Sequence, residues 1–323
     1  MPWQPSASIE MLRLRARMLQ RVRAFFAERG VLEVETPILS RAATTDPNLA
    51  SLVTRYTGPR HALGLTLYLH TSPEFPMKRL LAAGSGSIFQ VCKVFRDGED
   101  GRLHNPEFSM LEWYRVGFDH HQLMDEVAAL VACALERPGP VEKVLYREAF
   151  LRHAGVDPHR ASVDALAAAA RAHNVSVPTE MPRDDADPWR DLLLTHLVEP
   201  QLGRAGMTFL YDYPASQAAL ARVRNESVPL GERFELYIEG IEIANGFHEL
   251  GDAGEQERRF RADLERRRDR ALAEVPMDMQ LLAAQRQGLP DCAGVALGFD
   301  RLVMLAAGAI SIEEVLAFPL ERA

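Results

Sequence analysis

The feature that most constrains the fold is a pair of strand-like runs on either side of a short charged segment. Residues 88–95 (IFQVCKVF) and 108–116 (FSMLEWYRV) are rich in the β-branched and aromatic residues of buried strands. The segment that joins them, FRDGEDGRLHNPEF from Phe95 to Phe108, holds two glycines and six charged side chains. This composition predicts a β-hairpin that presents a cluster of charge at its turn.

The segments around this hairpin predict an α+β fold, in which an antiparallel sheet is flanked by helices. We expect one catalytic domain over residues 1–323, with a helical insertion at about 119–206. Helices are expected over residues 9–29, 72–84, 120–136, 147–154, 162–173, 185–199, 254–271 and 299–308. Strands are expected over residues 31–37, 63–70, 88–95, 108–116, 207–213, 232–238, 241–247 and 294–298.

Composition excludes several classes of protein. No run of 18 uncharged apolar residues occurs, which argues against a membrane span, and no signal peptide is evident at the N-terminus. The three cysteines form no CxxC pair, which is typical of a reducing, cytoplasmic setting. The net charge of −8 lowers the expectation of binding to nucleic acid through phosphates. The arginine-rich face of residues 9–29 is read as the solvated face of a packing helix, with a membrane or RNA surface as the alternative.

Several common motifs are absent. There is no GxxxxGK[ST] phosphate loop, and GSGSIF lacks the third glycine of a dinucleotide fingerprint. The HEL of residues 248–250 lacks the second histidine of a zinc protease. The pair His120 and His121 has no acidic ligand at useful spacing and is interpreted as a surface pair.

Three segments in order resemble the motifs of class II aminoacyl-tRNA synthetases. FFAERGVLEVETPIL, with Pro37, is similar to the first motif, which builds the dimer interface in that family and so implies a homodimer. VFRDGEDGRLHNPEFSMLEWY is similar to the second, with Arg96 as its ATP-binding arginine, and GVALGFDRLVML to the third, ending in Arg301. The resemblance covers nearly the whole chain and implies formation of an aminoacyl adenylate from ATP.

The resemblance also implies the residues of the ATP site. Arg96 would clamp the α-phosphate and the substrate carboxylate, and Arg301 would reach the γ-phosphate, as catalytic residues. Arginine suits this task because its planar fork matches phosphate oxygens and stays charged. Glu242 is placed to hold Mg²⁺ between phosphate oxygens, with Glu249 as a tentative second ligand. The remaining expected ATP contacts are Asp97, Gly98, Asn105, Phe108 under the adenine, Ile243 and Gly298.

Within class II, the segments TSPE (Thr71–Glu74) and GIEIANGFHELGD (Gly240–Asp252) resemble the amino-acid pocket of the lysyl branch. A buried carboxylate is costly unless a cation meets it, so Glu74 and Glu249 imply a substrate that bears ammonium groups. Tyr114 is expected to add a hydrogen bond and a ring face for a cationic tail. The expected substrate-binding residues are Ser72, Pro73, Glu74, Tyr114, Asn245, Glu249 and Ala296.

Departures from the lysyl branch indicate a narrower relationship. The sequence leaves no room for an anticodon-binding domain before the first motif, and Ala296 stands where those synthetases usually carry glycine. A core with YPASQAALA and GVALG resembles the family of ligases that adenylate (R)-β-lysine and transfer it to the ε-amine of a lysine on elongation factor P. No stable tRNA binding is then expected. The alternatives are a stand-alone lysyl-type synthetase acting on tRNA or a free amine, and an inactive regulatory paralogue.

Two questions stay open at this level. The second motif commonly begins Arg-Asn-Glu, but here Gly98 stands in place of the glutamate, so either the Gly98 backbone or a shifted Glu99 makes that nucleotide contact. The acceptor lysine, with a pKa of about 10.4, is neutral only to about one part in a thousand at pH 7. The pocket is hypothesised to lower this pKa, and a pH–rate profile for transfer with no inflection below pH 9 would argue against that.

Overall fold

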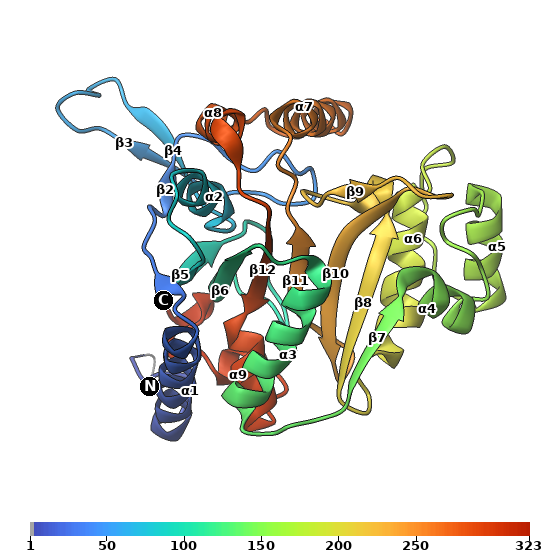
Figure 1. Cartoon of the computed structure of the whole chain (residues 1–323), viewed down its shortest axis with the longest axis horizontal. Coiled ribbons are helices and arrows are strands. Elements are labelled where there is room, and N and C mark those ends of the chain that lie inside the picture. Colours follow the sequence, from blue (N-terminus) through green and yellow to red (C-terminus); the bar gives the residue numbers. More distant parts are fainter. Residues whose placement is uncertain (1–2) are drawn as a thin grey trace.

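A computed structural model describes residues 3–323 and is built on one large sheet (Figure 1). Its strands run in the order β1-β5-β6-β12-β11-β10-β8-β7, and β9 pairs with β10. All neighbouring pairs are antiparallel except β1–β5 and β7–β8, which are parallel. The strands are β1 Leu32–Glu33, β5 Ile88–Phe95, β6 Glu107–Val116, β7 Val141–Leu145, β8 Met207–Pro214, β9 Val223–Arg224, β10 Leu230–Ile238, β11 Ile241–His248 and β12 Cys292–Gly298. The predicted α+β class is confirmed.

A small second sheet stands beside the large one, with the order β2-β4-β3. Its strands are β2 Leu39–Ser40, β3 Val53–Tyr56 and β4 Leu65–Leu69. Only β4 matches a predicted strand. The strand expected over residues 31–37 is reduced to the two residues of β1, because the chain then leaves the large sheet at Pro37 and crosses to the small one.

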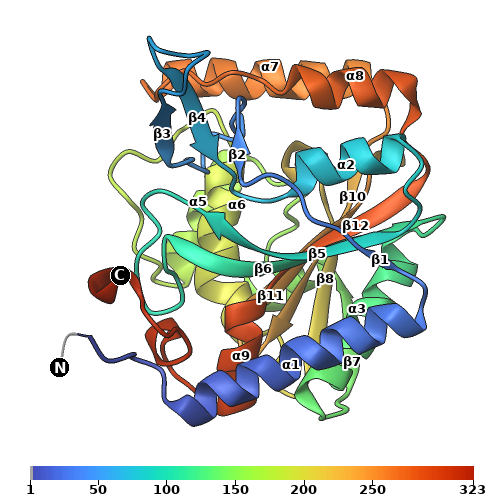
Figure 2. The ribbon, with the colours of Figure 1, turned by 90° about the vertical axis from the view of Figure 1, so that its left-hand side faces the viewer.

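The helices divide into three groups (Figures 1 and 2). One group packs on a face of the sheet: α1 Ile9–Glu28, α3 His120–Leu135 and α9 Phe299–Ala307. A second group lies over the top: α2 Glu74–Ala82, α7 Ala253–Asp269 and α8 Met279–Gly288. The third caps the β7 edge: α4 Tyr146–His153, α5 Val163–Ala172 and α6 Asp187–Leu193. Short helical turns follow at Leu194–Val198 (π) and at Glu199–Gln201, Ala215–Gln217, Ile312–Glu314 and Leu320–Arg322 (3₁₀).

The predicted insertion of about 119–206 contains two different parts. Its first helix, α3, buries its apolar face in the main core with α1, α9 and the sheet. Strand β7, which the sequence did not predict, extends the large sheet beyond β8. Helices α4 to α6 pack on these two edge strands and form a separate core around Tyr146, Phe150 and Trp189. The separate core is therefore confined to the α4–α6 group, which stands to the right in Figure 1.

The arginines of α1 divide between solvent and the protein: Arg13, Arg17 and Arg23 are exposed, whereas Arg15 and Arg21 are partly buried. Arg21 donates to the Ala134 carbonyl and Arg23 pairs with Glu33, while Arg15 reaches the buried Asp300. Of the helices in residues 3–323, none is both long and apolar enough to cross a membrane. Arg15 and Arg21 thus help to pack α1 against its neighbours, while the other arginines of the helix lie in solvent as expected.

Candidate active site

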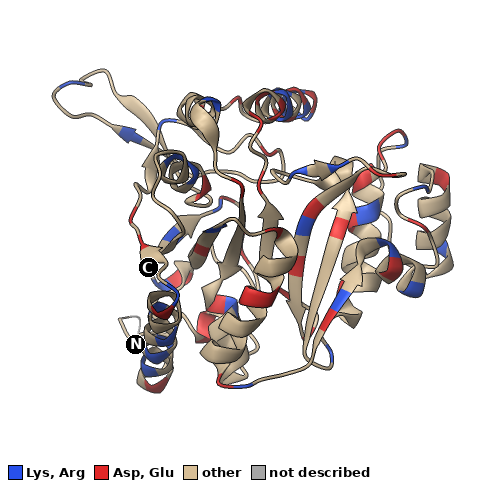
Figure 3. Ribbon diagram, viewed as in Figure 1, with Lys and Arg blue, Asp and Glu red and all other residues tan. Residues whose placement is uncertain are grey.

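A cleft of about 1490 Å³ opens over the sheet on the side away from α1, α3 and α9. Its floor is made by alternate residues of β6, β11 and β12, and its walls come from α2, from α7 and from the α6 end of the insertion. Acidic and basic residues are close together along β10, beside this floor (Figure 3). The cleft therefore combines an apolar frame with charged groups at fixed positions.

A buried ion triad lies at the α2 end of the cleft. The ammonium group of Lys78, which is fully buried, lies 2.6 Å from Glu74 Oε1 and 2.6 Å from Glu249 Oε2. Burial alone lowers the pKa of Lys78, but the two carboxylates outweigh it and raise that pKa above its ordinary value. The sequence predicted both acids but not Lys78, which follows Glu74 by one helical turn. Lys78 therefore already supplies part of the positive charge that these two acids were expected to receive from a substrate.

A third carboxylate, that of Glu112, joins this cluster from β6. Ser72 Oγ donates to Glu112 Oε2 at 2.7 Å, and the Tyr114 hydroxyl donates to Glu112 Oε1 at 2.7 Å. Burial raises the pKa of Glu112 to about 8, the charge of Glu74 adds to this, and the two hydrogen bonds oppose it. Tyr114 is 2% exposed, so it orients Glu112 and does not present an open ring face as predicted.

The charges of this acidic pocket do not balance when its carboxylates are ionised. Glu74 and Glu249 share the ammonium group of Lys78, whereas the third carboxyl, that of Glu112, is bonded only to the hydroxyls of Ser72 and Tyr114 among the described residues. Burial raises the pKa of Glu249 to about 7, against the opposing effect of Lys78. Glu112 and Glu249 therefore tend to be protonated near neutral pH, and the binding of a positively charged ligand favours their ionised form.

The β12 strand brings backbone and small side chains up to these acids. A Cβ on Gly294 would lie 2.3 Å from the Tyr114 ring and 2.4 Å from Glu249 Oε1, so only glycine fits there. Two residues on, Ala296 lies between Asn245 of β11 and Glu112 of β6 in the strand register and lines the cleft. The methyl group of Ala296 therefore borders the same space as the carboxylate of Glu112.

The second-motif hairpin is formed as predicted, and it places Arg96 at the cleft. The guanidinium carbon of Arg96 lies 5.1 Å from the centre of the Phe108 ring, and Nη1 lies 3.3 Å from Glu99 Oε1. Gly98 has a φ of +79°, which lets the turn bend between Asp97 and Glu99. Asp97 is exposed, and its backbone N–H donates to the Ala50 carbonyl. Glu99 is thus the acid that this turn brings to Arg96.

Arg301, at the start of α9, joins the third motif to the hairpin and to β11. Its Nη1 donates to the Glu242 carbonyl at 2.8 Å and lies 3.5 Å from the Glu242 carboxylate, which is 42% exposed. Its Nη2 lies 2.7 Å from His104 Nε2. Burial lowers the pKa of His104 and the positive charge of Arg301 lowers it further, which keeps the imidazole neutral beside the arginine.

Four other predicted residues have mainly structural contacts. Asn105 is buried, donates to the Glu107 carbonyl and accepts from the Leu320 N–H, so it fixes the hairpin to the C-terminal segment. Ile243 has its side chain in the main core, which leaves its backbone for a ligand. A Cβ on Gly298 would find ordinary contacts of 3.6 Å or more. Pro73 is buried at the N-terminus of α2.

Asn245, by contrast, faces the cleft next to a network that the sequence did not reveal. Its amide donates to Glu235 Oε1 at 3.1 Å, and its buried Oδ1 has no hydrogen-bond partner within the described residues. Arg233 pairs with Glu235 and also donates to the Gln217 carbonyl at 2.7 Å. Tyr213 and Tyr237 each donate to Glu235 Oε2 at 2.6 Å. This Arg233 network holds a fixed cation at the cleft wall opposite the acidic pocket.

The three motifs meet at one buried carboxylate. Asp300, 1% exposed, accepts from Arg15 of α1 through one oxygen and from the Ser109 N–H at 2.6 Å through the other. Arg15 also donates to Ser109 Oγ at 2.7 Å. Asp300 precedes Arg301, so this junction fixes the position of Arg301 relative to α1 and the hairpin.

The prediction that His120 and His121 form a surface pair is wrong for His120. This residue is 2% exposed, whereas His121 is exposed. His120 begins α3 on the face that carries Leu123 and Met124, and this face turns it toward the sheet. The acids near it, Asp212 and Glu232, come from strands distant in the sequence, which is why spacing along the chain gave no sign of them.

Comparisons with known proteins agree with this geometry. A model of the family described as "tRNA synthetases class II (D, K and N)" matches residues 3–322. Proteins named elongation factor P–(R)-β-lysine ligase from Vibrio cholerae serotype O1 and from Salmonella typhi are each 52% identical to this chain over 321 residues. A third, from Salmonella dublin, is 51% identical. Each alignment covers 99% of this chain and 98% of the relative.

Proposed function

This chain belongs to the family of class II tRNA synthetases of the D, K and N type, and we propose that it is an ATP-dependent ligase that adenylates (R)-β-lysine and transfers it to the ε-amine of a lysine on elongation factor P. The observation that carries the proposal is the acidic pocket, where Glu74 and Glu249 share one lysine and Glu112 adds a third carboxyl that is bonded only to hydroxyls among the described residues. A diamino acid such as lysine or β-lysine brings two ammonium groups to these carboxylates. A carboxylate-bearing substrate without amines would leave them uncompensated.

In the first step, a carboxylate oxygen of the amino acid attacks the α-phosphorus of ATP, and pyrophosphate leaves. Arg96 lies at the cleft edge where it can contact both the attacking carboxylate and the α-phosphate. Arg301 and Glu242 lie together further along β11. Fixed cations that meet developing charge on phosphate oxygens are the main source of rate acceleration in such reactions.

Of the two residues expected to bind Mg²⁺, Glu242 and Glu249, only Glu242 has surroundings that suit a magnesium ligand. The Glu242 carboxylate is partly exposed and is a hard oxygen ligand, so it would hold Mg²⁺, which neutralises charge on the phosphate oxygens when bound. Glu249 is bonded to the ammonium group of Lys78, a neighbour that disfavours a divalent cation. We therefore assign Glu249 to the amino acid and not to the metal.

In the second step, the neutral ε-amine of the acceptor lysine attacks the carbonyl carbon of the adenylate, AMP leaves, and an amide forms. The Ala215–Gln217 turn and the α6 end of the insertion border the same cleft as the acidic pocket. They are joined by hydrogen bonds from Ser216 Oγ to Asp187 and from Gln217 Nε2 to Asp191, at 2.8 and 2.6 Å. We propose that this rim of the cleft receives the acceptor protein.

The full reaction tests the proposal directly. Incubation with ATP, (R)-β-lysine and elongation factor P should increase the mass of elongation factor P by one β-lysyl group, and omission of any component should abolish the increase. Pyrophosphate exchange in the absence of elongation factor P separates the first step from the second. Exchange that is faster with α-lysine than with (R)-β-lysine would contradict the assigned substrate. Exchange without transfer would contradict the assigned acceptor.

We also propose a cytoplasmic homodimer that does not bind tRNA stably. The three cysteines are free, as expected in a reducing compartment. Leu32, Ile38 and Leu39 of the first-motif segment are apolar and 55%, 37% and 48% exposed. Exposed apolar residues grouped on one segment are typical of an association surface.

Replacing Ala296 by glycine should shift substrate preference toward α-lysine. The Ala296 methyl group borders the space next to Glu112, so its removal makes room for an amino group on the α-carbon in place of the β-carbon. One methyl group in such a pocket changes discrimination by about 1–3 kcal/mol. The ratio of kcat/KM values for the two amino acids in pyrophosphate exchange measures the shift, with Ala293→Gly on the other face of β12 as control. An unchanged ratio would show that Ala296 does not contact the substrate.

Substrate binding should release a proton from Glu112. Burial raises its pKa to about 8, so the carboxyl is largely protonated at pH 7 and must ionise to meet a substrate ammonium. Affinity for the diamino acid should therefore rise as pH increases from 6 to 8. Calorimetric titration at pH 7 in buffers with different ionisation enthalpies measures the protons released. Glu112→Gln should reduce this release to the smaller contribution of Glu249, and an unchanged release in that variant would assign the proton to another group.

Glu99→Ala should weaken ATP binding by up to about fivefold. Glu99 is the acid that the turn places beside Arg96, and a pair of this exposure contributes about 0.2–1 kcal/mol. Asp100→Ala, an exposed acid in the same turn, is the matched control. Equal ATP dissociation constants for wild type and Glu99→Ala would instead assign the nucleotide contact to the Gly98 backbone.

A further inference from the structure

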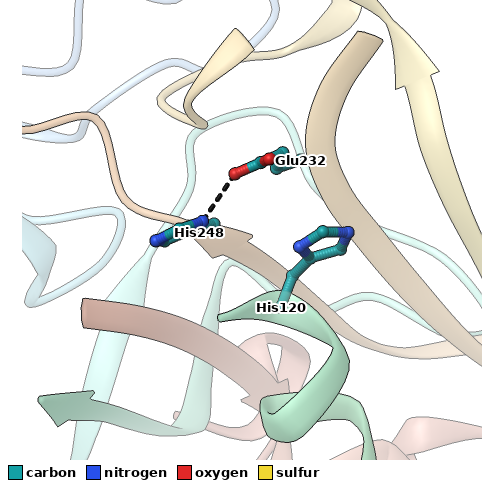
Figure 4. Close-up of side chains that lie close together, drawn as sticks. All are labelled: His120, Glu232 and His248. Atoms are coloured by element: carbon teal, nitrogen blue, oxygen red, sulfur yellow. Dashed lines mark hydrogen bonds and ion pairs between the residues drawn. The ribbon is translucent and has the colours of Figure 1, made fainter. Parts of the chain in front are cut away.

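A second cluster of polar side chains lies behind the sheet floor, away from the cleft. It joins His120 at the start of α3, Glu232 of β10 and His248 at the end of β11 (Figure 4). One ligand atom from each residue lies within 4.8 Å of the other two, and all three residues are buried. In Figure 4 the His120 ring points from α3 toward the space beside Glu232 and His248. The adenylation chemistry described above uses none of these three side chains.

His120 is the unexplained member of this cluster. It is 2% exposed, and within residues 3–323 neither of its ring nitrogens makes a hydrogen bond. Its nearest acid, Asp212 Oδ1, lies 3.4 Å from Nε2. A buried imidazole whose ion-pair partner lies as far away as 3.4 Å is poorly satisfied, and such groups often have a ligand or a catalytic role. The side chain therefore indicates that something binds beside it.

The surrounding residues match the outer sphere of a metal site. His248 Nδ1 lies 2.5 Å from Glu232 Oε2, while its other nitrogen, Nε2, lies 3.1 Å from Asp291 Oδ1. Metal-binding histidines almost always donate their second ring N–H to a carboxylate or carbonyl in this way. Arg224 fixes the acids, since it bonds to Asp212 at 2.8 Å and to Glu232 at 3.3 Å.

We propose that His120, Glu232 and His248 bind one transition-metal ion, with Zn²⁺ as the best match. Two imidazoles and one carboxylate, with a fourth position left open, are a common zinc ligand set. The imidazoles disfavour Mg²⁺, which prefers oxygen ligands. Ligand atoms around tetrahedral Zn²⁺ lie about 3.5 Å apart, so His248 Nδ1 and Glu232 Oε2, which are 2.5 Å apart here, separate by about 1 Å when the ion enters. The metal takes the place of the proton between His248 and Glu232.

The site would anchor the strand that carries the substrate-binding acid. Glu249 directly follows His248, so a metal held by α3, β10 and β11 fixes the end of β11 at the acidic pocket. The competing interpretation is an ion-pair network, in which protonated His248 bridges Glu232 and Asp291 and no metal binds. The two interpretations differ in whether the chain binds one metal ion, and this can be measured without substrates.

The test uses the full-length chain without an affinity tag, freed of metal by a chelator and titrated with Co²⁺. We expect one equivalent of Co²⁺ per chain, with the visible absorption of four-coordinate Co²⁺, and displacement by Zn²⁺. His120→Ala and Glu232→Gln should abolish this absorption, and Asp291→Asn should weaken binding by about 10–100-fold. His121→Ala, one residue away but exposed, should bind as wild type does.

Absence of stoichiometric binding to the wild-type chain would overturn the proposal, as would binding that persists in folded His120→Ala. Circular dichroism establishes whether each variant is folded, and Glu232→Gln keeps the shape of the side chain in case His120→Ala does not fold. Pyrophosphate exchange is measured separately, so loss of the metal site and loss of the ligase function are distinguishable.

Discussion

Arg96→Ala should reduce pyrophosphate exchange by about 10³-fold or more while leaving the fold intact. The guanidinium lies at the cleft edge, a quarter exposed, over Phe108 and beside Glu99. An arginine that stabilises charge on a transferring phosphoryl group contributes about 10³–10⁵ in rate. Lysine at this position keeps the charge but loses the planar fork, so Arg96→Lys should recover only a small part of the rate.

The control for this experiment is Arg171→Ala, which removes an exposed arginine from α5 in the insertion. It should exchange pyrophosphate as wild type does. The loss in Arg96→Ala should appear in kcat with both ATP and amino acid saturating, because the contact is strongest in the transition state. A variant with near-normal kcat and only a raised KM for ATP would assign Arg96 to nucleotide binding alone.

Lys78→Met should lower the free energy of unfolding by about 3–5 kcal/mol. Lys78 is fully buried between Glu74 and Glu249, and removing one partner of a buried ion pair leaves uncompensated charge. Urea denaturation measures the loss. Lys93→Met is the matched control: the Lys93 ammonium is 42% exposed and lies 3.6 Å from Glu107, so that pair should contribute about 0–1 kcal/mol.

The pH dependence of the Lys78→Met defect follows from the same charges. The pKa of Lys78 is raised, so its stabilising contribution in the wild type is fully present below about pH 10. In the variant, Glu249 loses its cation, so it is most destabilising when ionised. The loss of stability should therefore be largest near pH 8 and shrink toward pH 5, as the Glu249 carboxyl takes up a proton. A loss that is constant with pH would indicate a packing defect instead of uncompensated charge.

The features that could be predicted from the sequence are those that depend on a pattern within one short segment. The hairpin of β5 and β6 forms as expected, because its two apolar runs and glycine-containing turn specify it locally. Arg96 and Arg301 were identified from motifs whose spacing along the chain reflects one strand or one helix start. Both arginines could therefore be proposed before the fold was known, and their roles in adenylation stay predictions.

Only part of the acidic pocket could be predicted, because its balance of charge depends on side chains from different helices and strands. Glu112 alternates with Met110 and Tyr114 on one face of β6, and a charged residue within an apolar strand was the available signal. Lys78 follows Glu74 by four residues on α2, which would have suggested a pair. That Glu249 also reaches Lys78 could not be predicted, since β11 meets α2 only through the tertiary fold.

The junction at Asp300 has a consequence for when the protein becomes active. The bond from Arg15 to Asp300 joins residues 285 positions apart, and Arg301 directly follows it. While the protein is being synthesised, the first helix and the hairpin leave the ribosome long before the strand and helix of the third motif. The adenylation site is therefore incomplete on the nascent chain. It can form only when the last few dozen residues have been translated, so a chain truncated before Asp300 would lack activity even if its N-terminal half folded.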